Sequence, residues 1–465
     1  MHKSIDDTIA AVSTPVGEGG IGIVRLSGVA AIEIADKIFV SKSGALRKVA
    51  GFKSHTVHYG HVVSGKGPEI IDEVLLTVMR APKTYTKEDI VEINCHGGIQ
   101  ATKKVLDLVI ASGARLAEPG EFTRRAFLSG RLDLSQAEAV LDTIRAKTEG
   151  SLRAALNQLE GGLSKKVNGL IDKLADILAE IEASIDFPDE DIEPKDRVAI
   201  AKEAVLVLNG IKELTDSYGK GIVMREGVLA IICGKPNVGK SSLMNLLLKR
   251  DRVIVSPIPG TTRDAVEEMI DLGGVPIRLV DTAGIGRAKD PLGKKSANKT
   301  RGYMDAADIA LLVLDGSRKI DAKDRKIFRL VKGKKKIVII NKSDLGNKAA
   351  GPELDKLSEG SELIEVSVKK NTNIALLEKK IALFVLGGSI DQGESAMVAN
   401  ARHKESLDKA CGCVLSVVEA VKKEFQPELV AVDLREAIFS MGLVTGKSVS
   451  EDILNRIFEK FCIGK

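Results

Sequence analysis

The chain lacks any uninterrupted apolar run of the roughly 18 residues that a transmembrane helix requires. Its first residues, MHKSIDDTIA, also lack an apolar core behind a basic start, so they do not resemble a secretory signal. From these two absences we expect a cytoplasmic protein with no membrane segment.

Cysteine is scarce, with five residues among 465. So few thiols cannot form a disulfide framework, which fits a reducing compartment. Cys411 and Cys413 stand one residue apart, a spacing that could suggest a metal site, but no second cluster of cysteine or histidine accompanies them. We therefore expect both in ordinary helix positions.

Charge of one sign is scarce as well, because the formal net charge is only +5. Any nucleic acid is then expected to be held by local basic patches and not by bulk charge. What the chain does contain is apolar sequence: 44% of its residues are hydrophobic. Over this length, that is enough for two or three domains, each with a core of its own.

The apolar pattern changes three times along the chain. Up to about residue 130, residues 19–28 and 73–82 predict strands and residues 99–113 predict a helix, which indicates an α+β domain. From residue 152, apolar residues recur every three or four positions until Pro188 and an acidic run, which predicts one long amphipathic helix. These apolar residues are Leu156, Leu159, Leu163, Val167, Leu170, Leu174, Leu178, Ile181 and Ile185.

Residues 222–386 then alternate apolar strands with helical stretches, which is typical of a parallel sheet with crossover helices. The helical pattern resumes after residue 390. We therefore predict an α/β domain inserted into an all-α domain. The expected domains are residues 1–130, a first helical part at 131–221, the insertion at 222–386 and a second helical part at 387–465.

The segment GKPNVGKSS, residues 234–242, follows a strand pattern and opens a helical one, as a P-loop requires. Its glycines let backbone N–H groups turn toward phosphates. Lys240 can reach the β- and γ-phosphates, and the hydroxyl of Ser241 can bind Mg²⁺. Three further motifs follow in the order expected of a GTP switch.

Thr262 of GTTRD can close over magnesium and the γ-phosphate, while Asp281 and Gly284 of DTAG can serve the metal's water shell and the phosphate. Asp344 of NKSD can accept both N–H groups of guanine's Watson–Crick edge, where adenine offers an acceptor. Each motif alone could be a helix cap, a turn or a surface loop; four in order favour a Ras-like P-loop GTPase domain. The expected GTP-binding residues are Asn237, Val238, Gly239, Lys240, Ser241, Ser242, Ser256, Thr261, Thr262, Asp281, Thr282, Ala283, Gly284, Asn341, Lys342, Asp344, Ser367, Val368 and Lys369.

Beyond these motifs, the sequence resembles the tRNA modification GTPases of the MnmE or TrmE family over nearly its whole length. The resemblance lies in residues 7–28, 84–98 and 118–142, in the nucleotide motifs and in FCIGK at 461–465. It implies a potassium-stimulated GTPase that forms a homodimer through its N-terminal domain and binds 5-formyl-tetrahydrofolate or a related folate there. It further implies a flavoprotein partner, MnmG, in a heterotetramer that adds a carboxymethylaminomethyl group at C5 of the wobble uridine of certain tRNAs.

The resemblance also assigns roles by position. Its folate-contacting residues correspond to Arg25, Glu92, Arg131 and Lys465. Its potassium site corresponds to Asn237, Ser256, Ile258 and Thr261, and its magnesium ligands to Ser241 and Thr262. Cys462 corresponds to a cysteine that the family needs for modification, although a lone thiol here could equally be a small apolar anchor. Without the resemblance, Arg25 and Glu92 would be interpreted as solvated charges on strands.

One position departs from the family. A glutamate that orients the attacking water is expected twelve residues after Asp281, and Gly293 stands there. Asp290 is the candidate substitute and our candidate catalytic residue. Two interpretations therefore stay open: the GTP-hydrolysing component of wobble-uridine modification, or a slow-hydrolysing GTP switch or RNA-binding scaffold in ribosome or tRNA maturation.

Overall fold

The computed structural model describes residues 7–41, 48–64, 69–186, 197–251, 267–281, 302–388, 396–423 and 426–465. Its contacts divide the chain into two compact units. The first combines Met1–Leu141 with Thr445–Lys465, and the second is Asp142–Val444. No helix in the described part is both long and apolar enough to cross a membrane.

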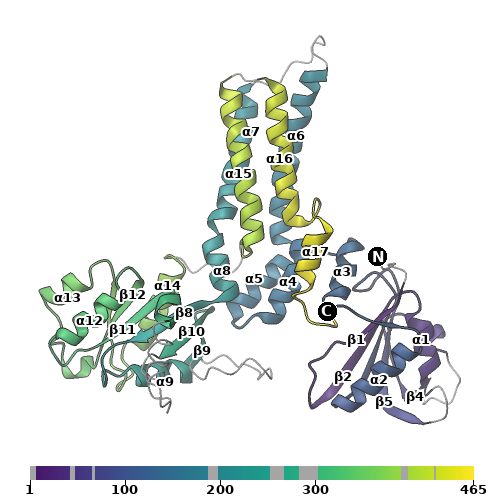
Figure 1. The fold of residues 1–465 in the computed structure, drawn as a ribbon, viewed down its shortest axis with the longest axis horizontal. Coiled ribbons are helices and arrows are strands. Elements are labelled where there is room, and N and C mark those ends of the chain that lie inside the picture. The colour runs from purple at the N-terminus through teal and green to yellow at the C-terminus, as the bar shows by residue number, and fades with distance from the viewer. Residues whose placement is uncertain are drawn as a thin grey trace. The chain divides into compact units, whose positions relative to one another are not determined.

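The first unit contains a seven-stranded sheet in the order β3-β4-β5-β6-β2-β1-β7. Its strands are β1 Ile9–Val12, β2 Gly19–Ser27, β3 Phe39–Ser41, β4 Thr56–Val63, β5 Ile70–Met79, β6 Ile90–Gly97 and β7 Arg115–Leu116. Helices α1 (Ala31–Ile38) and α2 (Ile99–Ala111) pack on it around one apolar core (Figure 1). The predicted α+β class, and the strands and helix predicted within it, are confirmed.

A smaller core in the same unit joins two distant parts of the chain. It lies among α3 (Glu121–Leu128), α4 (Leu134–Arg145) and α17 (Glu451–Phe458). Its buried members are Leu134, Ala137, Leu141, Leu454, Phe458 and Phe461.

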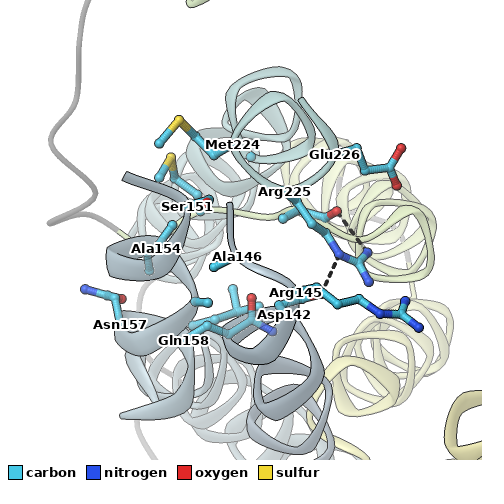
Figure 2. A pocket seen from close by; sticks show the side chains of 16 residues that line it. Asp142, Arg145, Ala146, Ser151, Ala154, Asn157, Gln158, Met224, Arg225 and Glu226 are labelled. Atoms are coloured by element: carbon cyan, nitrogen blue, oxygen red, sulfur yellow. Dashed lines mark hydrogen bonds and ion pairs between the residues drawn. The ribbon is translucent and has the colours of Figure 1, made fainter. Parts of the chain in front are cut away.

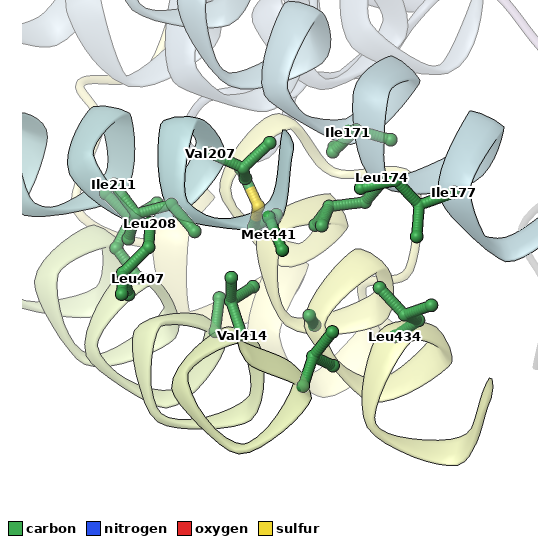
Figure 3. Close-up of a cluster of buried hydrophobic side chains, with 14 of the residues drawn as sticks. Ile171, Leu174, Ile177, Val207, Leu208, Ile211, Leu407, Val414, Leu434 and Met441 are labelled. Carbon is green, nitrogen blue, oxygen red and sulfur yellow. The ribbon is translucent and has the colours of Figure 1, made fainter. Parts of the chain in front are cut away.

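The second unit contains a helical bundle and an inserted α/β domain. Its helices are α5 Glu149–Leu159, α6 Gly162–Asp186, α7 Arg197–Asp216, α8 Tyr218–Glu226, α15 Ala401–Lys422 and α16 Pro427–Thr445. Side chains of α6, α7, α15 and α16 share one buried core, as Figure 3 shows. Since α6 and α7 precede the insertion and α15 and α16 follow it, the bundle is discontinuous in sequence. Cys411 and Cys413 lie on α15, as predicted.

The single long helix predicted from residue 152 is wrong, because the chain forms α5 and α6 in its place. Gly161 between them has φ +86°, a left-handed conformation that an α-helix does not contain. Leu159 and Leu163 still keep the spacing of four across the break, so the apolar pattern conceals it.

The inserted domain has a six-stranded sheet in the order β13-β12-β11-β8-β10-β9. Its strands are β8 Val228–Cys233, β9 Glu267–Leu272, β10 Val275–Asp281, β11 Ile309–Asp315, β12 Lys335–Asn341 and β13 Glu362–Glu365. Its helices include α9 Lys240–Asp251, α12 Ala322–Leu330, α13 Pro352–Leu357 and α14 Ile374–Val385. Neighbouring strands are parallel, as predicted, except that β9 pairs antiparallel with β10.

Candidate nucleotide-binding site

The P-loop follows β8, whose six residues are all buried, and ends where α9 begins at Lys240. Three of its residues have positive φ: Gly234 at +152°, Asn237 at +64° and Gly239 at +102°. A Cβ at Gly239 would lie 2.2 Å from Nδ2 of Asn341, so only glycine fits there. The loop thereby directs successive backbone N–H groups toward an anion.

The side chain of Lys240 lies inside this loop and is 7% exposed. Its Nζ donates hydrogen bonds to the carbonyl oxygens of Gly234, at 2.9 Å, and Lys235, at 2.7 Å. A buried ammonium needs such acceptors. Phosphate oxygens can replace them, which is the role predicted for Lys240.

Ser241 and Asp281 come from two different motifs and meet at the end of β10. The Ser241 hydroxyl donates to Oδ2 of Asp281 at 2.8 Å, and the carboxylate is buried. A hydroxyl and a carboxylate beside a phosphate loop are hard oxygen groups of the kind Mg²⁺ prefers. The residues present therefore fit a magnesium ion.

Asn341 connects the phosphate end of the site to its base end. Its Nδ2 donates to the Val238 carbonyl at 2.8 Å, and its Oδ1 accepts from the Val368 N–H at 3.1 Å. Lys342 follows in a left-handed conformation, φ +66°, and its Nζ donates to the Asn237 carbonyl at 3.0 Å. The NKSD segment thus holds the P-loop directly.

Asp344 carries the carboxylate predicted to recognise guanine. Its Oδ1 accepts a hydrogen bond from the Ser367 hydroxyl at 2.6 Å, and this bond lowers the pKa of Asp344. The carboxylate therefore remains an acceptor at neutral pH, as pairing with two guanine N–H groups requires. Lys369 follows in the same loop, while Ser242 lies exposed in the first turn of α9.

Two supporting acids were missed from the sequence. Asp315 ends β11 and forms an ion pair with Lys342 at 2.6 Å. Asp324, buried in α12, pairs with Lys235 of the P-loop at 2.7 Å. Asp315 could have been found, because it ends a buried apolar strand on the edge that carries the motifs. Asp324 had no such signal.

The rest of the predicted nucleotide and metal residues fall outside the described residues. They are Ser256, Ile258, Thr261, Thr262, Thr282, Ala283, Gly284 and Asp290. Gly293 lies outside them too. Of the predicted potassium ligands, only Asn237 is within the described part of the chain.

The predicted folate residues lie in the first unit. Arg25 on β2 and Glu92 on β6 face each other across the sheet and form an ion pair at 2.7 Å, each side chain being 20% exposed. The Arg25 guanidinium also lies 5.7 Å from the centre of the Phe122 ring. These two are therefore brought together, partly shielded, rather than standing as isolated solvated charges.

Arg131 stacks on Tyr85, with 4.9 Å from its guanidinium carbon to the ring centre, beside a hollow of about 360 Å³ that both residues line. Burial raises the pKa of Tyr85, so its hydroxyl stays protonated. The FCIGK tail is docked on the same unit: the Ser13 hydroxyl donates to the Gly464 carbonyl at 3.1 Å. Cys462 is exposed on this tail, two residues after Lys460 and three before Lys465.

Comparisons with known proteins agree with these motifs. A model of the MnmE helical domain matches residues 134–462, and a model of the GTP-binding protein TrmE N-terminus matches residues 8–131. The tRNA modification GTPase MnmE of Carboxydothermus hydrogenoformans is 47% identical over 463 residues, covering 99% of this chain and 100% of the relative. That of Thermoanaerobacter pseudethanolicus is 48% identical over 460 residues, covering 99% of each.

Among solved structures, Aquifex aeolicus Era bound to GDP and AlF4⁻ is 29% identical, covers 40% of this chain and 66% of its own, and has a TM-score of 0.27. The full-length matches and the helical-domain model, which spans well over half of the chain, carry the assignment. The chain belongs to the MnmE (TrmE) family of tRNA modification GTPases.

Proposed function

We propose that this protein is the GTP-hydrolysing component of a tRNA wobble-uridine modification system. With a flavoprotein partner of the MnmG type, it adds a carboxymethylaminomethyl group at C5 of the wobble uridine. The observation that carries the GTPase part is the convergence of Lys240, Ser241 and Asp281 with Asp344 around one P-loop. Membership of the MnmE family supports the tRNA part.

Each residue of the site has a distinct task. The P-loop N–H groups and Lys240 bind the phosphates, and Asp344 selects guanine over adenine because adenine would leave the carboxylate unpaired. When bound, Mg²⁺ would supply charge neutralisation at the phosphates. Ser241 and Thr262 are the proposed ligands of the ion, and Asp281, which accepts a hydrogen bond from the Ser241 hydroxyl, would serve its water shell.

Potassium completes the proposed charge stabilisation. Asn237, which has a left-handed conformation on the P-loop, is one proposed ligand. Hard oxygen groups suit an alkali cation, and a cation beside the phosphates can take the part that an arginine plays in other switches. Ser256, Ile258 and Thr261 are the other proposed ligands.

The first unit is proposed to bind a reduced folate and to form the homodimer. Arg25 and Glu92 offer opposite charges on adjacent strands, and Arg131 and Lys465 add cations in the same unit. A carboxylate can accept paired N–H donors of a pterin, while arginine and lysine can hold folate carboxylates. Cys462, exposed on the tail, is the proposed thiol of the modification step.

The second candidate function is a slow GTP switch or RNA-binding scaffold, and glycine at position 293 favours it. A positioned general base contributes roughly 10²- to 10⁴-fold to a rate. We therefore expect the protein to bind GTP normally, respond to potassium, and hydrolyse slowly unless Asp290 positions the water.

Single-turnover GTP hydrolysis in potassium should be measured for wild type, Gly293→Glu and Asp290→Ala. The slow-switch interpretation predicts a faster rate in Gly293→Glu and no loss in Asp290→Ala. A wild-type rate that is already high, unchanged by the first substitution and abolished by the second, would reject the slow switch and assign the water to Asp290. Mass spectrometry of wobble uridines from a deletion strain tests the modification itself: an unchanged modification level would reject it.

A further inference from the structure

The turn between β9 and β10 docks on the first turn of α5. The Thr148 hydroxyl, at the N-terminus of α5, donates to the Gly274 carbonyl at 2.6 Å. A Cβ on Gly150 would lie 2.4 Å from that same carbonyl oxygen and 2.6 Å from Cε of Met224, so the two backbones approach as closely as glycine allows. This is a specific contact between the inserted domain and the bundle.

A second close approach involves the start of β10 and the end of α8. Gly227, which ends α8 with φ +77°, would place a Cβ only 2.7 Å from the Pro276 carbonyl oxygen. Arg225 of α8 forms an ion pair with Asp142 at 2.8 Å and reaches the Ala399 carbonyl at 3.4 Å. Figure 2 shows Arg225, Met224 and Ser151 around a cavity of about 160 Å³. The first residues of β10 thus lie close to both α5 and α8.

The other end of β10 is Asp281, the acid that meets Ser241 in the nucleotide site. Seven residues of extended strand span about 20 Å, and six of the seven side chains of β10 are buried. Five consecutive residues of β10 pair with β8, and the strand also pairs with β9. A buried strand with partners on both edges transmits a displacement along its axis rather than absorbing it.

The contact can be separated from the stability of α5. Thr148 caps this helix by accepting from the Ser151 N–H at 3.1 Å. Its hydroxyl lies within donating distance of the Gly274 carbonyl, at 2.6 Å, and of the Ser151 hydroxyl, at 3.0 Å, and the shorter contact is the one to Gly274. Aspartate is an equally good N-cap but has no proton to donate. Thr148→Asp therefore keeps the cap and loses the contact, whereas Thr148→Ser keeps both.

We propose that the docking of the β9–β10 turn on Thr148 and Gly150 couples the nucleotide site to the helical bundle, with Thr148 acting as a positioning residue through β10. This inference rests on the proposed GTPase function, whose nucleotide states it links to α5. Because such coupling is reciprocal, whatever binds the bundle and shifts α5 also changes nucleotide affinity.

Hydrogen exchange on the full-length chain tests the coupling. Protection of residues 149–159 should be compared with GDP and with a non-hydrolysable GTP analogue, both with Mg²⁺ and K⁺. In wild type and Thr148→Ser, we expect protection to differ by about 2- to 10-fold between the two states, the range for one hydrogen bond. In Thr148→Asp, and independently in Gly150→Ala, the difference should disappear while both nucleotides still bind.

Two results would overturn the inference: equal protection of α5 in both states of the wild type, or an undiminished difference in both Thr148→Asp and Gly150→Ala. Titration of the wild type with a fluorescent GTP analogue distinguishes a failure of the coupling from a failure of the proposed GTPase function. If the wild type binds and hydrolyses GTP but the protection of α5 is the same in both nucleotide states, the coupling alone is rejected. A wild type that binds no GTP rejects the GTPase assignment and the coupling with it.

Discussion

At the scale of single residues, the nucleotide site depends on side chains that bind the protein backbone as well as on those that face the ligand. Asn341 spans from the Val238 carbonyl to the Val368 N–H, so one amide keeps the phosphate loop and the base-binding loop in register. Asp344 is oriented by Ser367 in the same way. The motif residues therefore position each other and the loops that carry them.

We predict that Asp344→Asn weakens GTP binding, because an amide N–H₂ would face guanine's donors. The loss should be about 1 to 3 kcal/mol for each group left unpaired. Titration calorimetry with GTP measures it, with Asp355→Asn, an exposed acid on α13 of the same domain, as the matched control. If Asp344→Asn bound GTP as tightly as wild type, guanine recognition would have to lie elsewhere.

The Arg25–Glu92 pair provides a test in the first unit. If both charges contact a folate, Glu92→Ala should reduce affinity for 5-formyl-tetrahydrofolate by about 2 to 5 kcal/mol, since it leaves partly buried charges without a partner. The same calorimetry on Glu33→Ala, which removes an exposed acid paired with Lys37 on α1, should show no change. Equal folate affinity in wild type and Glu92→Ala would end the assignment of Glu92.

At the scale of helices and strands, the sequence predicts elements with a regular apolar pattern but does not reveal breaks within such a pattern. The strands before the P-loop and before NKSD are continuous apolar runs, so their positions and the parallel sheet could be predicted. The break at Gly161 could not, because the apolar spacing passes through it unchanged. The antiparallel β9 was also missed, since its polar residues Glu267, Glu268 and Asp271 dilute the apolar pattern of an edge strand.

The same limit applies to the candidate site. Motif residues were predictable because their chemistry needs a particular residue type at a particular spacing. Their partners were not: Asp324 reaches Lys235 from a helix nearly ninety residues later, a pairing that only the folded sheet creates. The pairing of Arg25 with Glu92 likewise follows from the register of β2 and β6, which no local pattern specifies.

At the scale of the whole molecule, the first unit and the helical bundle within the second unit are each assembled from separated segments. Residues 445–465 complete the core of the first unit, and α15 and α16 complete a bundle that α6 and α7 begin. Stability of the first unit should therefore depend on side chains more than 300 residues away from its sheet, roughly the number of residues from β6 to α17.

We predict that Phe458→Ala lowers the unfolding free energy of the first unit by about 3 to 5 kcal/mol, because its ring is 2% exposed in the core with Leu134. Phe439→Ala makes the same change at a ring on α16 that is 48% exposed, and should cost less than about 1 kcal/mol. Differential scanning calorimetry of the full-length variants measures both. Similar losses in the two would show that α17 does not complete this core.

Because the bundle is discontinuous in sequence, its folding cannot be completed on the ribosome until the helices that follow the inserted domain have been synthesised. Helices α6 and α7 are synthesised before the inserted domain. Their apolar faces lack their partners, α15 and α16, until about 200 more residues have been translated. At roughly 5 to 20 residues per second, this takes about 10 seconds or longer. During that interval the inserted domain, whose strands and helices are contiguous in sequence, is translated completely, and we expect it to fold before the bundle. Nascent chains would then pass through a stage in which a formed inserted domain is tethered to an unfinished bundle whose apolar surface chaperones can bind.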